Sequence, residues 1–228
     1  MNLLSIRSIS FAAATLVMAA SANALTIDWT KMQGTSILAF SPNAISLFQA
    51  NGGKLAALGN TTAVGTGGWT FSLPITSIEI SSSLKVASGQ ASGSALDIVR
   101  RVFDDQGNIL TSGIVLANFT LDYTNKKVLA DSTPRGGATQ AQLAVFTFNA
   151  ATPLALKYKF PLTVTGHEVL DQLVLTPGAV DLFASSLGLS GDAVLNLVRT
   201  TDFGTLTQDI STNARKPAVS KTPYVPAP

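Results

Sequence analysis

Residues 96–116 read LDIVRRVFDDQGNILTSGIVL, two apolar runs joined by a short polar stretch. The connecting residues Asp105, Gln106, Gly107 and Asn108 are typical of a tight turn, because glycine and asparagine tolerate positive backbone φ angles. Strand-forming runs on both sides of such a turn predict an antiparallel β-hairpin. This part of the sequence therefore indicates β-structure with local, antiparallel pairing.

The same alternation of apolar and polar residues recurs along the chain. Residues 69–73 (WTFSL), 119–123 (FTLDY) and 156–160 (LKYKF) each place every second side chain on one face. A period of two is typical of strands with one buried and one solvated face. Turn signals at 125–127 and 134–137 separate such runs at intervals of roughly ten residues, which favours a sandwich or barrel. We predict a mainly β fold, a single antiparallel β-sandwich-like domain.

One segment near the end of the chain carries helix signals instead. Thr176 precedes Pro177, apolar residues follow at helical spacing, and Gly188 ends the run. Threonine caps free amide groups, proline suits the first helical position, and glycine suits the exit. This pattern predicts a helix from Pro177 to the residue before Gly188.

Two further segments resemble it. Ser41 and Pro42 begin a similar pattern that ends in the glycines of residues 51–53. Ser190 is the expected cap of another short helix over residues 193–198. The predicted domain therefore contains two or three short α-helices.

The two ends of the chain differ from this middle part. Residues 1–24 carry Arg7, then an apolar stretch, then small residues at 22–24, the pattern of a secretory signal peptide. Its apolar run is shorter than the ~20 residues that span a bilayer, and no later segment is long enough either. Residues 213–228 hold four prolines, typical of an extended, flexible tail. We predict a signal peptide over 1–24, a β-rich domain over 25–212, a Pro-rich flexible C-terminal tail over 213–228, and an exported protein, periplasmic or extracellular.

Composition excludes several classes of function. The chain has no cysteine, which excludes thiol nucleophiles, Cys-ligated zinc and iron–sulfur clusters. The net charge of +2 falls to +1 when the signal peptide takes Arg7 away, too little for a nucleic-acid-binding surface. The sequence contains none of the common hydrolase, phosphate-binding, dinucleotide-binding or zinc-protease motifs. We expect no enzyme, no nucleic-acid partner and no dedicated metal site.

Three side chains are candidates for binding a ligand. His167 is the single histidine and can ligate haem or a metal, or act as a base; alternatively it is a polar turn residue between two strands. Tyr158 and Tyr123 lie in alternating runs and can ligate haem as phenolates or stack on a ligand. The alternative for both tyrosines is packing in the core or at its rim.

The order of five short motifs resembles the exported bacterial domains related to the haem-transport-associated HtaA domain. The motifs are FSPNAI at 40–45, FSLPIT at 71–76, NFTLD at 118–122, VLAD at 128–131 and LTPGAVDLF at 175–183. The resemblance spans roughly residues 35–210 and implies a β-rich fold with a Leu-Thr-Pro helix near its end. It also implies haem binding through a tyrosine near the start of the domain. Here that region has Trp29 but no tyrosine before Tyr123, so the ligand is not carried over.

These observations lead to two functional hypotheses. The first is an exported, non-catalytic protein that binds haem or another small hydrophobic ligand. The second is a structural or surface-interaction protein of the bacterial envelope or extracellular matrix, whose partner is another envelope or surface protein. Low charge and Ser/Thr/Gly-rich strands favour the second hypothesis, and the three candidate side chains favour the first.

Overall fold

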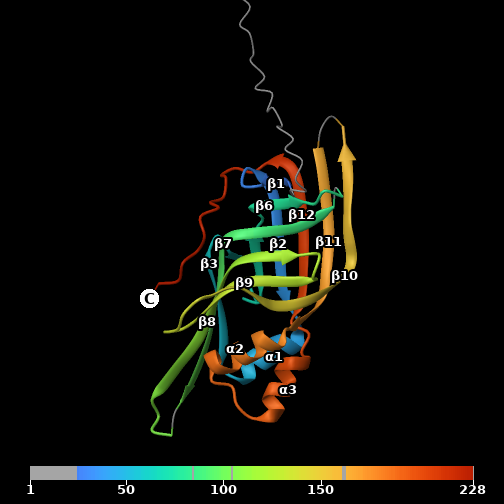
Figure 1. The fold of residues 1–228 in the computed structure, drawn as a ribbon. Helices are drawn as coiled ribbons and strands as arrows, with labels where there is room; N and C mark the ends of the chain where they lie inside the picture. Colours follow the sequence, from blue (N-terminus) through green and yellow to red (C-terminus); the bar gives the residue numbers. More distant parts are fainter. Residues whose placement is uncertain (1–24, 84, 104, 161–162, 228) are drawn as a thin grey trace, which may run out of the picture.

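The computed structural model describes residues 25–227, apart from residues 84, 104 and 161–162. The predicted signal peptide over 1–24 lies outside the described residues. Within them the chain forms twelve strands and three helices, so the predicted mainly β class is confirmed (Figure 1). In chain order the elements are β1 (Leu25–Asp28), β2 (Met32–Phe40), α1 (Pro42–Ala50), β3 (Gly53–Gly59), β4 (Thr62–Ala63), β5 (Thr70–Pro74), β6 (Ser77–Ile80), β7 (Val86–Phe103), β8 (Ile109–Asp122), β9 (Lys127–Pro134), β10 (Gln140–Lys159), β11 (Thr163–Leu175), α2 (Pro177–Leu187), α3 (Asp192–Thr200) and β12 (Gly204–Ala214).

All twelve strands belong to one antiparallel sheet that curls into two layers. Its order is β1-β6-β7-β8-β9-β10-β11-β12-β2-β5-β4. β6 pairs with the first part of β7, and β3 pairs with a later part, Ser94–Arg100. The strands β6 to β9 run across the direction of β2, β12 and β11, as two layers packed at a steep angle do (Figure 1). β10 joins the layers: its first part pairs with β9, and three register shifts bend it along β11. The architecture confirms the predicted sandwich-like domain.

The hydrophobic core lies between the two layers and beneath the helices. Its main cluster includes the fully buried side chains Leu96, Ile114, Leu116 and Leu170, which come from β7, β8 and β11. A smaller cluster near the opposite end of the sheet consists of Trp29, Ile75 and Ile78, with Met32 and Ile210 packed against it. The alternating runs of the sequence supply both clusters, because every second strand residue faces inward.

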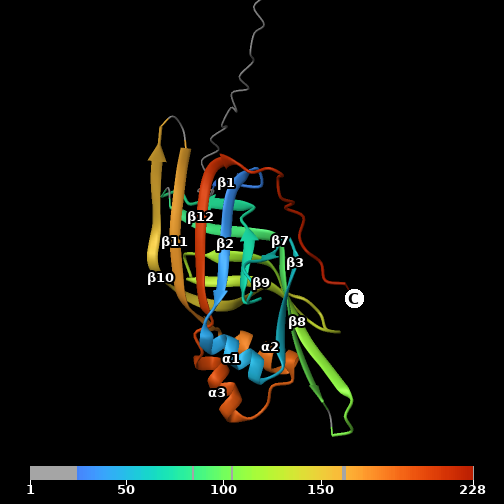
Figure 2. The same cartoon turned by 180° about the vertical axis from the view of Figure 1, so that it is seen from behind.

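Two of the three described helices begin where the capping signals predicted. The hydroxyl of Ser41 accepts from the amide of Ala44 at the start of α1, and that of Thr176 accepts from the amide of Ala179 at the start of α2. Gly188 ends α2 in the left-handed conformation. The predicted cap of α3 was wrong: Gly191 rather than Ser190 holds the cap position, without a side-chain hydrogen bond. The three helices lie together at one end of the sandwich (Figure 2). They have nine to eleven residues each, too short to span a bilayer.

The strands are longer than the alternating runs indicated. The predicted hairpin over 96–116 is formed by β7 and β8, but β7 already begins at Val86. A register shift between Ala91 and Ala95 includes Gly93 at a φ of 76°, which interrupts the alternation there. Likewise, all but the last residue of the run over 156–160 belongs to β10, which already begins at Gln140.

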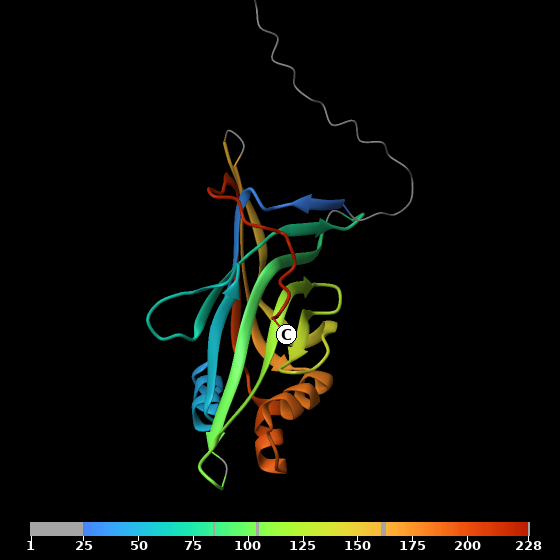
Figure 3. The same cartoon turned by 90° about the vertical axis from the view of Figure 1, so that its left-hand side faces the viewer.

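The C-terminal segment runs extended along the sheet instead of away from it. β12 reaches Ala214, and the following residues lie beside β7 and β8 (Figure 3). The side-chain amide of Asn118 accepts from the backbone N–H of Tyr224 (2.7 Å) and donates to its carbonyl (3.0 Å). Asn60 donates to the carbonyl of Ser220 (2.7 Å). These bonds fix the course of a segment that has few apolar side chains of its own.

Candidate ligand groove

A groove of about 720 Å³ crosses the outer face of β10, β11, β12 and β2. Its floor follows a row of cross-strand neighbours, in which Ala155 pairs with His167, His167 with Asp209, and Asp209 with Thr35. Side chains of directly opposed residues share one face of a sheet, which brings these four together. The remaining lining residues are Gln33, Gly34, Thr152, Lys157, Thr165, Gly166, Ile210, Ser211 and Arg215.

His167 is the functional group at the centre of this row. Its Nδ1 lies 2.8 Å from Oδ1 of Asp209, and its side chain is 54% exposed. Among the described residues, Nε2 has no hydrogen-bond partner. A carboxylate at Nδ1 fixes the ring orientation and the tautomer with the proton on Nδ1, which leaves the lone pair of Nε2 available. The pair therefore has the arrangement of a metal-ligating histidine with its orienting carboxylate.

Two cations flank the groove on opposite sides. Lys157 lies on β10, two residues after Ala155 and on the same face of the sheet. Arg215 follows β12 and donates to the backbone carbonyls of Gly34 and Ile75. Burial lowers the pKa of Arg215 from its ordinary value, but an arginine remains charged at neutral pH. The groove thus combines a flat floor of small side chains with a positive charge at each side.

Tyr158 lies on the other face of the β10–β11 hairpin. Lys157 pairs with Thr165 and Tyr158 pairs with Val164, so consecutive residues of β10 alternate between the two faces. His167 shares its face with Ala155 and Lys157, and Tyr158 therefore does not line the groove. Its side chain is 65% exposed.

Tyr123 lies inside the sandwich, apart from both other candidates. Its hydroxyl donates to Oε2 of Glu168 at 2.6 Å, and Glu168 is 2% exposed. Burial and the neighbouring carboxylate raise the pKa of Tyr123 well above its usual value. Burial also raises the pKa of Glu168, against the opposing effect of the hydrogen bond from Tyr123. The structure thus places Tyr123 in a buried polar pair, and the three candidate residues do not share one site.

Two inward-facing polar residues continue the row from Glu168. Glu168 pairs with Gln208, and Gln208 pairs with Ser36 across β12 and β2. The Nε2 of Gln208 is buried without a hydrogen-bond partner among the described residues. It borders a cavity of about 20 Å³, which has room for one water molecule.

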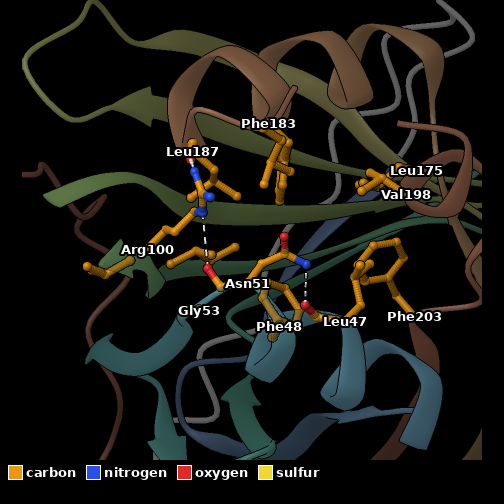
Figure 4. A pocket seen from close by; sticks show the side chains of 13 residues that line it. Leu47, Phe48, Asn51, Gly53, Arg100, Leu175, Phe183, Leu187, Val198 and Phe203 are labelled. Atoms are coloured by element: carbon orange, nitrogen blue, oxygen red, sulfur yellow. Dashed lines mark hydrogen bonds between the residues drawn. The ribbon is translucent and has the colours of Figure 1, made fainter. Parts of the chain in front are cut away.

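An apolar cavity lies between the helices and the end of the sheet (Figure 4). Its volume is about 30 Å³, enough for a water molecule but far below the 300–1,000 Å³ of typical ligand pockets. Arg100 closes one side: it donates to the carbonyls of Asn51, Leu187 and Gly188, at the ends of α1 and α2. These bonds satisfy helix carbonyls that have no partner within their own helix. This cavity is therefore a packing feature between helices.

Of the ionisable residues that line the groove, only His167 was predicted from the sequence as a candidate. Asp209, Lys157 and Arg215 come from β12, β10 and the segment after β12. No motif connects them, because the strand register alone brings them to one face. The LKYKF alternation did indicate that Lys157 and Tyr158 lie on opposite faces.

Comparison with known proteins shows a weak structural relationship. No protein-family model and no curated protein sequence match the chain. Among solved structures, the chain is similar to the C-terminal domain of HtaA from Corynebacterium glutamicum, with 13% sequence identity. The match covers 79% of this chain and 98% of that domain, with a TM-score of 0.46.

Proposed function

We propose that the protein is an exported, non-catalytic binding protein whose groove takes a small planar ligand, and that this ligand is haem. The main support for this proposal is the His167–Asp209 pair on the groove floor. Asp209 holds Nδ1 of the imidazole, and Nε2 is available to bind iron. One histidine is enough to bind an iron that a macrocycle already holds, whereas structural zinc sites take four protein ligands. The single histidine of this chain suits the first case.

The shape and charge of the groove support the same ligand class. Its volume of about 720 Å³ falls within the usual range of small-molecule sites. Small residues such as Gly34, Ala155 and Thr165 leave a flat surface on which a planar ring can lie. Lys157 and Arg215 supply positive charge at the two sides, and the cation at either side can neutralise the propionate groups, which both lie on one edge of a haem.

The test is a haemin titration of residues 25–228, followed by the Soret band. We expect a shifted band that saturates with haemin. His167→Ala should abolish the shift or weaken binding at least tenfold. Asp209→Asn should weaken it by about tenfold to a hundredfold, since it disturbs the group that orients the ring.

Tyr158→Phe is the matched control, because Tyr158 lies on the opposite face of the same hairpin. This variant should bind haemin as the parent protein does. Absence of a Soret shift, or an equal shift in the His167→Ala variant, would refute the proposal. Loss of the band in Tyr158→Phe alone would place the ligand on the other face and refute it as well.

The second hypothesis, a surface-interaction protein, has its own supporting observation. Large apolar side chains are exposed at the ends of two projecting hairpins: Phe103 and Ile109 on β7–β8, and Tyr158 and Phe160 on β10–β11. Contiguous exposed apolar side chains are typical of interaction sites.

A further inference from the structure

Three neighbouring strand pairs shift register at the same level of the sheet. The shifts between β7 and β8, between β8 and β9, and between β9 and β10 include Gly93, Asn118 and Gln142, respectively. These residues have positive φ angles of 76°, 52° and 47°. Such angles are uncommon outside glycine, and residues held in them are concentrated at ligand clamps and active sites. Asp131 joins the row, because its carboxylate accepts from the side chain of Asn118 (2.8 Å) and the N–H of Gln142 (2.9 Å).

This row orients the side-chain amide of Asn118. Its Oδ1 accepts from the N–H of Gly93 (3.0 Å), and its Nδ2 donates to Asp131. The same two atoms bond the backbone N–H (2.7 Å) and carbonyl (3.0 Å) of Tyr224, so all four hydrogen-bonding positions of the amide are used. An amide that bonds both backbone groups of one residue replaces the edge of a neighbouring strand. The sheet therefore carries a preformed site for an extended chain.

The C-terminal segment, residues 219–227, occupies this site mainly through its backbone (Figure 3). The N–H of Val219 donates to the carbonyl of Thr30 (3.2 Å). The carbonyl of Ser220 accepts from the side chain of Asn60 (2.7 Å). Recognition of this kind requires an extended backbone and depends little on side-chain identity.

The surface beneath the segment allows an unusually close approach. A Cβ added to Gly93 would lie 2.8 Å from the carbonyl oxygen of Thr222, and one added to Gly59 would lie 2.9 Å from the ring of Tyr224. A side chain at either position would displace the segment. The surface is therefore shaped to fit this chain closely.

The segment is nevertheless weakly attached. No side chain of residues 219–227 is buried. Lys221 forms an ion pair with Asp28 at 3.2 Å, but both side chains are more than half exposed. Exposed ion pairs and hydrogen bonds that water can replace contribute little net free energy. The segment can therefore leave its site without disrupting the hydrophobic core.

A short connection joins the segment to the body of the protein. Arg215 stays with the body, because its guanidinium donates to the carbonyls of Gly34 and Ile75. Residues 216–218, which follow it, are exposed and lie outside the strands. Short connections of this kind favour the exchange of identical segments between copies, since every contact of the segment forms again in the partner.

We propose that the site around Asn118 docks the C-terminal segment of a second copy, so that two copies exchange residues 219–227. A short linker gives the segment an effective concentration in the millimolar range at its own site. Exchange therefore occurs where copies are crowded, as at a surface, whereas a dilute copy keeps its own segment. The residues that contact the segment do not line the ligand groove, so this docking is independent of haem.

The test uses residues 25–228, which contain every described strand and helix, and exchanges the charges of the Asp28–Lys221 pair. Asp28→Lys and Lys221→Asp each place like charges together, both within one copy and between two identical copies. In an equal mixture, exchange brings the introduced lysine to the introduced aspartate, and the remaining Asp28 to the remaining Lys221. Sedimentation equilibrium at low ionic strength should give an association constant about tenfold higher for the mixture than for either variant alone. Salt should remove the gain.

The Arg135–Asp97 pair offers the matched control. Its atoms also lie 3.2 Å apart, but both residues belong to the body of the protein. Exchange of the segment cannot restore this pair, so a mixture of Asp97→Lys and Arg135→Asp should show no gain. Tyr224→Pro changes only the segment and removes the N–H that donates to Asn118. Added to both charge variants, it should abolish the gain.

The parent sequence provides a second measurement that does not depend on the charge variants. At ~1 mM it should form dimers, and Asn118→Gly, which keeps the backbone angle but removes the amide, should weaken them at least tenfold. Circular dichroism checks that each variant is folded.

Four outcomes would overturn the proposal: a parent that stays monomeric at ~1 mM, no gain on mixing folded charge variants, an equal gain in the control mixture, or a gain that survives Tyr224→Pro.

Discussion

Tyr123→Phe is the most informative single substitution in the buried interior. It removes one oxygen and leaves the ring, which packs edge to face against Phe148, in place. The lost group is the hydroxyl that donates to Glu168 at 2.6 Å. Because Glu168 is 2% exposed, solvent does not replace this donor, and the carboxylate loses a charge-assisted hydrogen bond.

The expected cost follows from the type of bond. A hydrogen bond to a charged group contributes about 1.5–3 kcal/mol, so the free energy of unfolding should fall by about 2 kcal/mol at pH 7. For a domain of this size, ~1 kcal/mol corresponds to about 2–4 °C in Tm. The variant should therefore melt about 4–8 °C below the parent protein.

The cost should depend on pH in a defined direction. Burial raises the pKa of Glu168, so the folded state holds this proton more tightly than the unfolded state does. The stability linked to Glu168 is therefore complete below its ordinary pKa of 4.5 and decreases as the pH rises through the folded-state value. The Tyr123 hydroxyl opposes this decrease, because it stabilises the ionised form. Tyr123→Phe should consequently cost more at pH 7 than at pH 4, where the bond is to a neutral carboxyl group.

Thermal and urea unfolding, followed by circular dichroism at both pH values, provide the measurement. Glu168→Gln is the partner variant, since it keeps an acceptor for the hydroxyl but cannot ionise. In a double-mutant cycle, Tyr123→Phe should cost only about 1 kcal/mol in the Glu168→Gln background. A Tyr123→Phe variant within about 0.5 kcal/mol of the parent at pH 7, or a cost independent of pH, would contradict this account.

Three further substitutions test the local structure. Thr176→Ala removes the cap of α2 and should lower the free energy of unfolding by about 1–2 kcal/mol in urea titrations; no change would mean that the cap is dispensable. Gly204→Ala places a Cβ 2.0 Å from the carbonyl oxygen of Ala39 at a φ of 125°, and should cost at least about 3 kcal/mol, whereas a parent-like Tm would contradict the geometry. Hydrogen bonds from Thr30 lower the pKa of Asp28 to about 2, so its contribution is complete above about pH 4 and is lost as the pH falls through 2. Asp28→Asn should flatten this acid-dependent decrease, and an unchanged pH profile would refute the assignment.

The sequence correctly predicted those features that depend on residues close together in the chain. The turn at Asp105–Asn108 lies within a few residues of both strands that it joins, and the prediction of the β7–β8 hairpin was confirmed. Thr176, Pro177 and Gly188 likewise define α2 through their own backbone preferences. Local signals of this kind need no information about the rest of the fold, which explains why they were sufficient.

The groove has no such local cause. His167 and Asp209 are 42 residues apart and meet because β11 and β12 pair in one register. A shift of one residue would turn Asp209 to the other face of the sheet. In the same way, Tyr123 meets Glu168 because β8 and β11 face each other in the folded sheet, and no local sequence pattern predicts that contact. The sequence alone therefore indicated the candidate residues, whereas only the structure shows which residues surround them.

The pairing order of the sheet also determines when its strands find their partners. From β6 to β11 every strand pairs with its successor in the chain. The pairs from β6–β7 to β10–β11 need only short loops to close, whereas α2 and α3 lie between β11 and β12. β2 is different, because it pairs with β12 and β5, and β12 is synthesised after all other strands. During synthesis, one edge of β2 stays open until residues 204–214 arrive. We therefore expect a chain truncated before β12 to leave this edge exposed, and the joining of β2 to β12 to be a late step in folding.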